Sequence, residues 1–354
     1  MSLLSFDLDQ SNMFQILKDF PVQVEEALSI GDKAPVFKNR CESGKFLALG
    51  MGGSAIGADL LRSFLSNTSG ADHISLQVNR NYHLSQNLGQ DTNVIISSYS
   101  GGTEETLSGF ADGLKKFSNF IAITSGGELS RIAQVENIPV ISIPGGLQPR
   151  CALGYSFFPL LKLIMKSGII ADEYLGNINN SIAETMQLLK DKSELYTIDS
   201  PENPAVLLAH KLWSKIIVVY SSSNILDCVN IRWRGQIQEN AKNFAFGNFI
   251  PEMNHNEINS WSFPENLKSS MLPLIIRDKD DYAKNKKRFD AITSIFKENG
   301  NDPINIESHA ESLLARIFDL IYLGDWTSYY LALLNGVDPT PIPLITKLKN
   351  YLAG

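Results

Sequence analysis

Short apolar runs alternate with longer amphipathic stretches along the first half of the chain. The runs that predict strands are residues 46–49, 74–78, 93–97, 120–124 and 139–143. Apolar residues recur at helical spacing in residues 12–28, 55–64, 104–116 and 129–136. Strands that are apolar throughout and alternate with helices are typical of a parallel sheet that helices cover on both faces.

The alternation resumes in the second half, after two consecutive helical stretches at residues 150–170 and 171–203. Strands are predicted at residues 215–220, 272–277 and 304–306, and helices at residues 232–243, 282–299 and 312–335. The sequence therefore predicts an α/β protein with two doubly wound, flavodoxin-like parallel-sheet domains. The expected parts are an N-terminal helical extension (1–45), a first domain (46–170), a helical connection (171–205) and a second domain (206–354).

Composition limits the classes of partner. The 354 residues carry a formal net charge of −7, which argues against nucleic acid as the main partner, since binding its phosphates needs clustered Lys and Arg. The three cysteines are scattered and predict reduced thiols, with neither a disulfide framework nor a zinc site. No stretch approaches the roughly 20 apolar residues that a membrane span needs, and the N-terminus does not resemble a signal peptide. We expect a soluble cytoplasmic protein without a metal or other cofactor and without a nucleic-acid or membrane partner.

A glycine-rich turn follows the first predicted strand. It reads GMGGSAIG over residues 50–57 and leads into a helix. Glycines at such a turn let backbone amides approach an anion, and the helix N-terminus favours negative charge there. The turn also loosely satisfies a dinucleotide fingerprint, but the second strand ends in Asn79, where that fingerprint has an acidic residue for the ribose. The sequence therefore favours a phosphate monoester, bound by Gly52, Gly53 and Ser54.

A second turn, rich in hydroxyl side chains, follows the third predicted strand. The segment SSYSGGTEE places Ser98, Ser100 and Thr103 around two glycines at the start of a helix. Hydroxyls and backbone amides can surround a phosphate, which would let an acidic protein bind a dianion without a lysine cluster. The alternative for this turn is a plain helix cap, with Thr103 as the N-cap. Both turns follow neighbouring strands at their carboxyl ends, where doubly wound sheets bind ligands, so together they favour a ligand site.

These motifs resemble those of a known family. The first half is similar to the sugar isomerase (SIS) fold in the segments GMGGSAIGADL, SSYSGGTEET and ITSGGEL. The chain further resembles the bifunctional phosphoglucose/phosphomannose isomerase family in PGGLQPRCALGY, RWRGQIQENAK, PEMNHNEINSW and the tail DPTPIPLITKLK. The resemblance implies two SIS domains, a homodimer, and metal-free interconversion of glucose 6-phosphate and/or mannose 6-phosphate with fructose 6-phosphate.

The resemblance also implies roles for individual residues. Aldose–ketose isomerisation moves a proton between C1 and C2 through an enediol, so it needs a base, an acid/base for ring opening and positive charge near the enediolate. Glu239, in QENAK, matches the family's base. His255, in NHNE, matches the ring-opening histidine, which in related isomerases reaches the site from the second subunit. Arg150, in QPRCALGY, matches the arginine that stabilises the enediolate.

The tail and the His255 segment supply further candidates. Lys349 resembles the family's C-terminal lysine, which assists ring opening, and Lys347 is a near competitor for that role. Thr340, in DPTP, resembles the threonine linked to acceptance of mannose 6-phosphate, and turn chemistry between two prolines is the alternative for it. Glu252 and Glu257 flank His255, and either one of them orients the imidazole or both are solvated loop charges.

Three other functions share part of this pattern. A non-catalytic SIS sugar-phosphate sensor would use the same phosphate turns without Glu239 or His255 near the sugar, and it usually carries a fused DNA-binding segment, for which residues 1–40 have too little basic character. An isomerase of an amino-sugar or pentose phosphate fits the same phosphate turns. An NAD-dependent dehydrogenase is disfavoured by Asn79.

Overall fold

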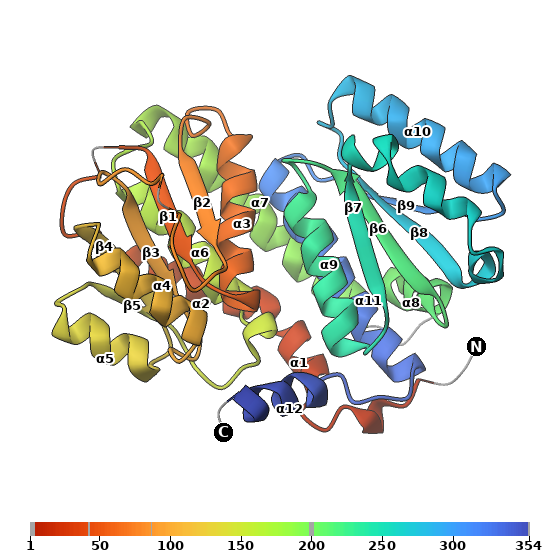
Figure 1. Cartoon of the computed structure of the whole chain (residues 1–354), viewed down its shortest axis with the longest axis horizontal. Helices are drawn as coiled ribbons and strands as arrows, with labels where there is room; N and C mark the ends of the chain where they lie inside the picture. The colour runs from red at the N-terminus through yellow and green to blue at the C-terminus, as the bar shows by residue number, and fades with distance from the viewer. Residues whose placement is uncertain (1–3, 42, 86, 198–201, 353–354) are drawn as a thin grey trace. The chain divides into compact units, whose positions relative to one another are not determined.

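The computed structural model describes residues 4–41, 43–85, 87–197 and 202–352, and the chain divides into two compact units (Figure 1). Unit A comprises Phe20–Met186, and unit B comprises Met1–Asp19 together with Gln187–Gly354. A long helix, α7 (Asp172–Thr197), continues from unit A into unit B. Each unit holds one parallel sheet, so the predicted α/β class with two parallel sheets is confirmed.

The sheet of unit A has five parallel strands in the order β2-β1-β3-β4-β5. The strands are β1 (Lys45–Leu49), β2 (Ser75–Asn79), β3 (Asn93–Ser97), β4 (Asn119–Thr124) and β5 (Val140–Ser142). The chain winds first toward one edge and then toward the other, so β1 and β3 flank the point where the strand order reverses. Doubly wound sheets bind ligands beside the carboxyl ends of the strands at this point.

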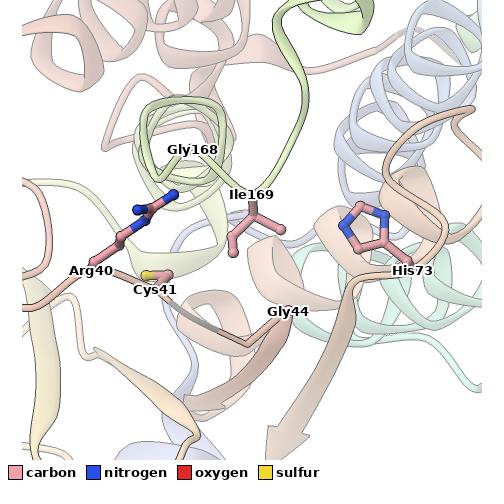
Figure 2. A pocket seen from close by; sticks show the side chains of 6 residues that line it. All are labelled: Arg40, Cys41, Gly44, His73, Gly168 and Ile169. Carbon is pink, nitrogen blue, oxygen red and sulfur yellow. The ribbon is translucent and has the colours of Figure 1, made fainter.

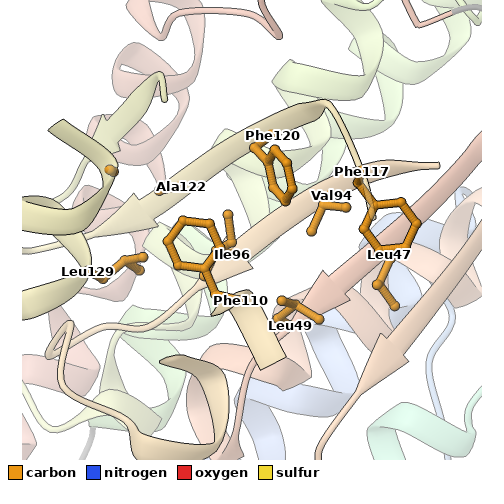
Figure 3. Close-up of a cluster of buried hydrophobic side chains, with 10 residues drawn as sticks. Leu47, Leu49, Val94, Ile96, Phe110, Phe117, Phe120, Ala122 and Leu129 are labelled. Atoms are coloured by element: carbon orange, nitrogen blue, oxygen red, sulfur yellow. The ribbon is translucent and has the colours of Figure 1, made fainter. Parts of the chain in front are cut away.

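Helices cover both faces of this sheet because its strands are apolar on both faces. The helices of unit A are α2 (Phe20–Lys33), α3 (Gly52–Ser66), α4 (Glu104–Leu114), α5 (Gly127–Val135) and α6 (Leu153–Lys166). On one face, alternate strand residues such as Val94 and Ile96 pack with Phe110 of α4 and Leu129 of α5 (Figure 3). Helix α3 packs against β1 and β2 and against α6, which in turn packs against α2.

The predicted helix over residues 150–170 differs from the structure at its start. A 3₁₀ turn, η2 (Pro149–Cys151), comes first, and α6 begins only at Leu153. Proline favours the first position of such a turn because its φ is already helical, and Ala152 then leaves the helical region with φ −103° and ψ 29°. Arg150 therefore lies in a separate turn and not on α6.

The sheet of unit B has four parallel strands in the order β7-β6-β8-β9. The strands are β6 (Ile216–Ser222), β7 (Ala245–Ile250), β8 (Met271–Arg277) and β9 (Ile304–Glu307). Strand β7 was not predicted, because its sequence AFGNFI contains Gly247 and Asn248, two residue types that are depleted in strands. It lies at the edge of the sheet and pairs only with β6 among the described strands, so it is only partly buried.

One long helix forms the centre of unit B. The helices of this unit are α1 (Met13–Lys18), α8 (Pro204–Leu212), α9 (Asp227–Asn240), α10 (Ala283–Glu298), α11 (Leu313–Leu334) and α12 (Pro343–Leu352), and a 3₁₀ turn, η1 (Phe6–Leu8), precedes them. Helix α11 is buried over most of its length and packs against α1, α8 and α9. The Tyr322 hydroxyl of α11 donates to the Leu17 carbonyl of α1 at 2.7 Å, which fixes the N-terminal residues on unit B. Within the described part of the chain, no helix is both long enough and apolar enough to cross a membrane.

The core of unit A gives a prediction for stability. Phe110 is 1% exposed and packs on the sheet, whereas Val135 at the end of α5 is 70% exposed. Phe110→Ala should destabilise unit A by about 3–5 kcal/mol because it removes a buried ring and leaves a cavity. Val135→Ala should change stability by less than about 0.5 kcal/mol. Scanning calorimetry checks both variants, and equal shifts of the unfolding transition would contradict this description of the core.

Candidate functional site

The turn after β1 brings backbone amides to the carboxyl edge of the unit A sheet. Helix α3 begins at Gly52, whose φ of +46° is left-handed, a conformation that glycine adopts at little cost. A Cβ on Gly53 would lie 2.5 Å from the Pro149 carbonyl oxygen, so only glycine allows the η2 turn to approach this closely. The buried Ser54 hydroxyl accepts the Tyr99 N–H at 2.9 Å. A hydroxyl that accepts a hydrogen bond still has its own proton to donate.

The turn after β3 places three hydroxyl side chains at the same edge. Ser98 is fully buried, and its Oγ lies 3.0 Å from the Thr103 Oγ1. Thr103 is the N-cap residue of α4, but its side chain accepts no bond from the first turn of the helix. The Ser100 Oγ accepts the Gly102 N–H at 3.3 Å and is exposed. Two hydroxyls that pair with each other beside an uncapped helix N-terminus are suited to donate to an anion.

The turn after β4 braces the turn after β3. Gly101 has a φ of +70°, and a Cβ on it would lie 1.9 Å from the Gly126 carbonyl oxygen. The Ser125 Oγ donates to the Tyr99 carbonyl at 2.6 Å, and the Leu129 N–H donates to the Gly101 carbonyl at 2.8 Å. The ITSGGEL segment therefore contributes to the site by holding the hydroxyl-bearing turn in place.

Arg150 lies beside these turns. It is 4% exposed and belongs to the η2 turn, which packs against the start of α3. Its backbone nitrogen lies 2.9 Å from the position that a Cβ on Gly53 would occupy. Unit A thus gathers the six predicted phosphate ligands and Arg150 around the carboxyl ends of β1 and β3. A buried arginine there supplies positive charge beside a turn built of neutral donors.

The corresponding edge of unit B is filled by charges of the protein itself. The carboxyl ends of β6 and β8 flank the point where that sheet reverses its strand order. The Ser222 hydroxyl donates to Asp281, and the guanidinium of Arg316 binds both oxygens of Asp278 at 2.8 and 3.0 Å. Arg316 and Asp278 are both buried. A phosphate at this edge would face two carboxylates, so the two sheets are not equivalent as anion sites.

Glu239 lies in the last turn of α9 and is half-buried. Side chains of this helix bind α11 through polar contacts. Arg232 and Gln236 bind the fully buried carboxylate of Asp325 at 2.6 and 2.9 Å, and the Asn240 amide donates to the Ser328 hydroxyl at 2.9 Å. These contacts fix the rotation of α9, and with it the direction of the helix face that carries Glu239.

Lys242 links the end of α9 to the loop that carries Thr340. Its Nζ donates to the Asn240 carbonyl at 3.0 Å and to the Asp338 carbonyl at 2.6 Å. The Asp338 side chain accepts the Thr340 N–H at 2.9 Å. Sequence reasoning assigned no role to Lys242, although it closes the ENAK motif and has a left-handed φ of +52° that marks an unusual backbone position.

His255 and the C-terminal lysines lie on exposed parts of unit B. His255 ends the 3₁₀ turn η3 (Glu252–His255) and is exposed. Lys347 and Lys349 are both exposed on α12, and the choice between them stays open. Glu257 accepts hydrogen bonds from Tyr220 and Asn248, and Glu252 accepts one from Asn256. Neither carboxylate binds the imidazole among the hydrogen bonds of the described residues.

Comparison with known proteins decides the family. A family model described as the bacterial phospho-glucose isomerase C-terminal SIS domain matches residues 201–352. A bifunctional phosphoglucose/phosphomannose isomerase from Caldicellulosiruptor bescii is 41% identical over 343 residues, which cover 96% of this chain and 99% of the relative. The chain belongs to the bifunctional phosphoglucose/phosphomannose isomerase family. The relative of the same name from Aquifex aeolicus is 34% identical, with 86% of this chain and 88% of that protein covered.

A solved structure supports the fold of this family member. The glucose-6-phosphate isomerase like protein from Thermus thermophilus matches with a TM-score of 0.61 at 16% identity, covering 97% of this chain and 95% of that one. At this level of identity the likeness shows the fold alone. The predicted SIS-type architecture and the resemblance to the bifunctional isomerases are therefore confirmed.

A cavity of about 410 Å³ is lined by residues that are not among the predicted site residues (Figure 2). Gly44 and His73 line it just before β1 and β2, together with Arg40, Cys41 and Ile169. It thus opens at the amino ends of the strands, opposite the carboxyl edge that holds the phosphate turns. The side chains of Arg40 and His73 are both exposed. Within the described residues, no group of three or more His, Cys, Asp or Glu side chains could hold a metal ion.

The packing of the glycine turns predicts how binding responds to an added methyl group. Gly101→Ala would place Cβ against the Gly126 carbonyl in a left-handed backbone conformation. We expect it to weaken binding of fructose 6-phosphate about 10- to 100-fold, the equivalent of the roughly 1–3 kcal/mol cost of such strain. Gly102→Ala is the matched control, since no atom lies within 4 Å of its Cβ position. Isothermal titration calorimetry with fructose 6-phosphate measures both, and equal affinities for the two variants would contradict the role of this turn.

Proposed function

We propose that the chain is an aldose–ketose isomerase that interconverts glucose 6-phosphate and mannose 6-phosphate with fructose 6-phosphate in the cytoplasm. The observation that carries this proposal is the similarity to a bifunctional phosphoglucose/phosphomannose isomerase over nearly the whole length of both chains. The physical arrangement of unit A supports it, because a hydroxyl-lined turn at the point where the strand order reverses is suited to a phosphate monoester.

The phosphate group is the proposed anchor of the substrate. Backbone amides of Gly52 and Gly53 and the hydroxyls of Ser54, Ser98, Ser100 and Thr103 donate to its oxygens. The support for this assignment is the pairing of Ser98 with Thr103 and the absence of a side-chain cap on α4. Anchoring the far end of the sugar holds C1 and C2 in one place, which lowers the entropy cost of the reaction.

Glu239 is the proposed base. For the ketose, its carboxylate takes a proton from C1, which leaves an enediolate with its negative charge on O2. The proton on O1 then moves to O2, and the carboxylic acid returns its proton to C2, which gives the aldose with its carbonyl at C1. Arg150 stabilises the negative charge on the enediolate oxygens. Thr340 is the proposed residue for accepting mannose 6-phosphate, whose C2 has the opposite configuration to that of glucose. Lys242 joins the end of α9, the helix that carries Glu239, to the backbone of Asp338, whose side chain accepts the Thr340 N–H. This connection supports assigning Thr340 and the base to one site.

His255 and Lys349 are the proposed groups for ring opening. A histidine can move a proton to and from the ring oxygen near pH 7 because its ordinary pKa lies close to that pH. The exposure of His255 supports a further proposal that the protein works as a homodimer, in which this imidazole serves the active site of the partner subunit.

The base assignment predicts a selective loss of turnover. The purified protein should interconvert fructose 6-phosphate with both aldose phosphates in the presence of EDTA. Glu239→Gln should lower kcat at least about 100-fold while fructose 6-phosphate still binds, because the amide cannot accept the carbon-bound proton. Glu298→Gln, an exposed substitution on α10, is the control and should keep normal turnover. Coupled assays and exchange of the substrate proton in D₂O measure both, and near-normal exchange in Glu239→Gln would remove this residue from the role.

The dimer proposal predicts recovery of activity on mixing two inactive variants. If His255 serves the partner's site, a hybrid of Glu239→Gln and His255→Ala subunits contains one site with both groups intact and one with neither. Unfolding and refolding an equal mixture should restore about one quarter of the wild-type activity, since half of the dimers are hybrids with one working site of two. Each variant refolded alone is the control. No recovery, with a dimer seen by size-exclusion chromatography, would place His255 in its own subunit's site.

The same assays separate the alternatives. A sugar-phosphate sensor would bind fructose 6-phosphate with no exchange of its protons. An isomerase of another substrate would turn over glucosamine 6-phosphate or a pentose 5-phosphate faster than the hexose 6-phosphates. Zinc-restored activity after chelation would contradict the metal-free part of the proposal.

A further inference from the structure

The segment that carries His255 has little regular structure of its own. It consists of two short 3₁₀ turns, η3 (Glu252–His255) and η4 (Glu257–Ser262), that follow the edge strand β7. Such turns have poorer hydrogen-bond geometry than an α-helix, so they depend on tertiary contacts for a fixed position. A group that transfers a proton must lie within hydrogen-bond reach of its target, so the position of this segment matters for the proposed role of His255.

Two apolar side chains fasten the segment to the core of unit B. Met253 is 0% exposed and Trp261 is 4% exposed, and both belong to a cluster with Tyr220 and Phe296. The rings of Trp261 and Phe296 lie 4.7 Å apart. These contacts hold the segment at residues before and after His255. Apolar packing has little directionality, however, and does not by itself determine how the turn between the two anchors is oriented.

A chain of hydrogen bonds fixes the orientation of the turn between these two anchors. The carboxylate of Glu257 accepts the Tyr220 hydroxyl at 2.6 Å on one oxygen and the Asn248 amide at 2.7 Å on the other. The Tyr220 hydroxyl in turn accepts the Trp261 indole N–H at 2.9 Å. Tyr220 is fully buried on β6, and Asn248 lies on β7. Glu257 therefore ties the turn, two residues after His255, to the neighbouring strands β6 and β7.

The Tyr220 hydroxyl acts as a donor in this hydrogen-bond chain. Burial, together with the Glu257 carboxylate beside it, raises the pKa of Tyr220, so the hydroxyl keeps its proton and remains a donor near neutral pH. A charged carboxylate forms stronger hydrogen bonds than a neutral acceptor. Asn256 adds a local brace, because its side chain accepts the Glu257 N–H at 2.6 Å and donates to the Glu252 carboxylate at 2.8 Å.

We propose that Glu257 is a positioning residue that sets the place of the His255 imidazole through Tyr220 and Asn248, without contact with the sugar or the imidazole. The inference rests on the proposed function, in which His255 opens the sugar ring. The sequence left open whether one of Glu252 and Glu257 orients the imidazole or both are solvated loop charges, and in the structure both carboxylate oxygens of Glu257 bind groups of the sheet.

The test separates ring opening from proton transfer at carbon. 5-Deoxyfructose 6-phosphate lacks the hydroxyl that closes the furanose ring, so it stays in the open-chain keto form and needs no ring opening. Glu257→Gln retains one acceptor oxygen and replaces the other with a donor, so it cannot accept hydrogen bonds from both Tyr220 and Asn248. We expect this variant to lose about 100-fold in kcat on fructose 6-phosphate, the scale of a displaced catalytic group. Its rate of C1 proton exchange on the deoxy analogue in D₂O should stay within about threefold of wild type.

Three further variants complete the experiment. His255→Ala gives the reference pattern, a loss on the ring-forming substrate and none on the open-chain one. Tyr220→Phe removes the hydroxyl that donates to Glu257 and accepts the Trp261 N–H, and it should show the same split at smaller size. Glu265→Gln is the control, and because this exposed residue lies in the 3₁₀ turn η5 (Glu265–Ser270), outside η3 and η4, it should keep normal rates on both substrates.

The outcomes distinguish the positioning role of Glu257 from the ring-opening role of His255. Equal losses of Glu257→Gln on both substrates, or normal rates on both, overturn the positioning role while His255→Ala still shows the split. Absence of the split in His255→Ala itself overturns the ring-opening role of the histidine, and with it the positioning role of Glu257. The melting temperature of every variant identifies a loss that comes from unfolding, which would affect both substrates alike.

Discussion

The approach of two backbone turns at Gly101 and Gly126 is the constraint on which the proposed phosphate site depends. No side chain fits between them, since a Cβ on Gly101 would lie 1.9 Å from the Gly126 carbonyl oxygen. The contact brings the turn after β4 against the turn after β3, so Ser98 and Thr103 meet in front of the N-terminus of α4. An acidic chain can then offer an anion several neutral donors and one buried arginine at the edge of a sheet. A local group of donors can favour an anion in a chain with a formal net charge of −7, because charges spread over the whole chain are screened by solvent.

The two parallel sheets show how one architecture serves different purposes. In unit A the carboxyl edge at the strand reversal holds glycines and hydroxyls, whereas in unit B it holds the Arg316–Asp278 pair and the Ser222–Asp281 bond. Arg316 and Asp278 pair with each other there, so this arginine is already bound to a carboxylate and an anion would face acidic side chains. The groups of unit B that we propose for catalysis lie instead on α9 and on the His255 segment, which follows β7. Fold alone therefore does not predict where a ligand binds, and the side chains at each edge decide it.

Much of this organisation follows from local sequence signals. Apolar runs located eight of the nine strands, and the turn residues Gly52, Ser98 and Thr103 stand directly after two of those strands. The exception, β7, has Gly247 and Asn248 in its middle and is stabilised by pairing with β6, a contact that no local pattern contains. Whether the Thr103 side chain caps the helix also needed the structure, since a cap and a phosphate ligand would use the same residue at the same place. Its hydroxyl pairs with Ser98 and leaves α4 without a side-chain cap.

Contacts between distant residues mark the limit of such reasoning. Tyr220 and Glu257 are 37 residues apart, and Arg232 and Asp325 are 93 apart, so neither pair is visible as a motif. These pairs matter because apolar packing alone permits small rotations of a helix or turn. A slip of α9 by one turn would separate the fully buried Asp325 carboxylate from Arg232 and Gln236. Leaving such a charge unpaired costs about 3–5 kcal/mol, a large share of the stability of a domain. The polar contacts therefore exclude neighbouring registers of α9, and so fix the direction in which its last turn presents Glu239.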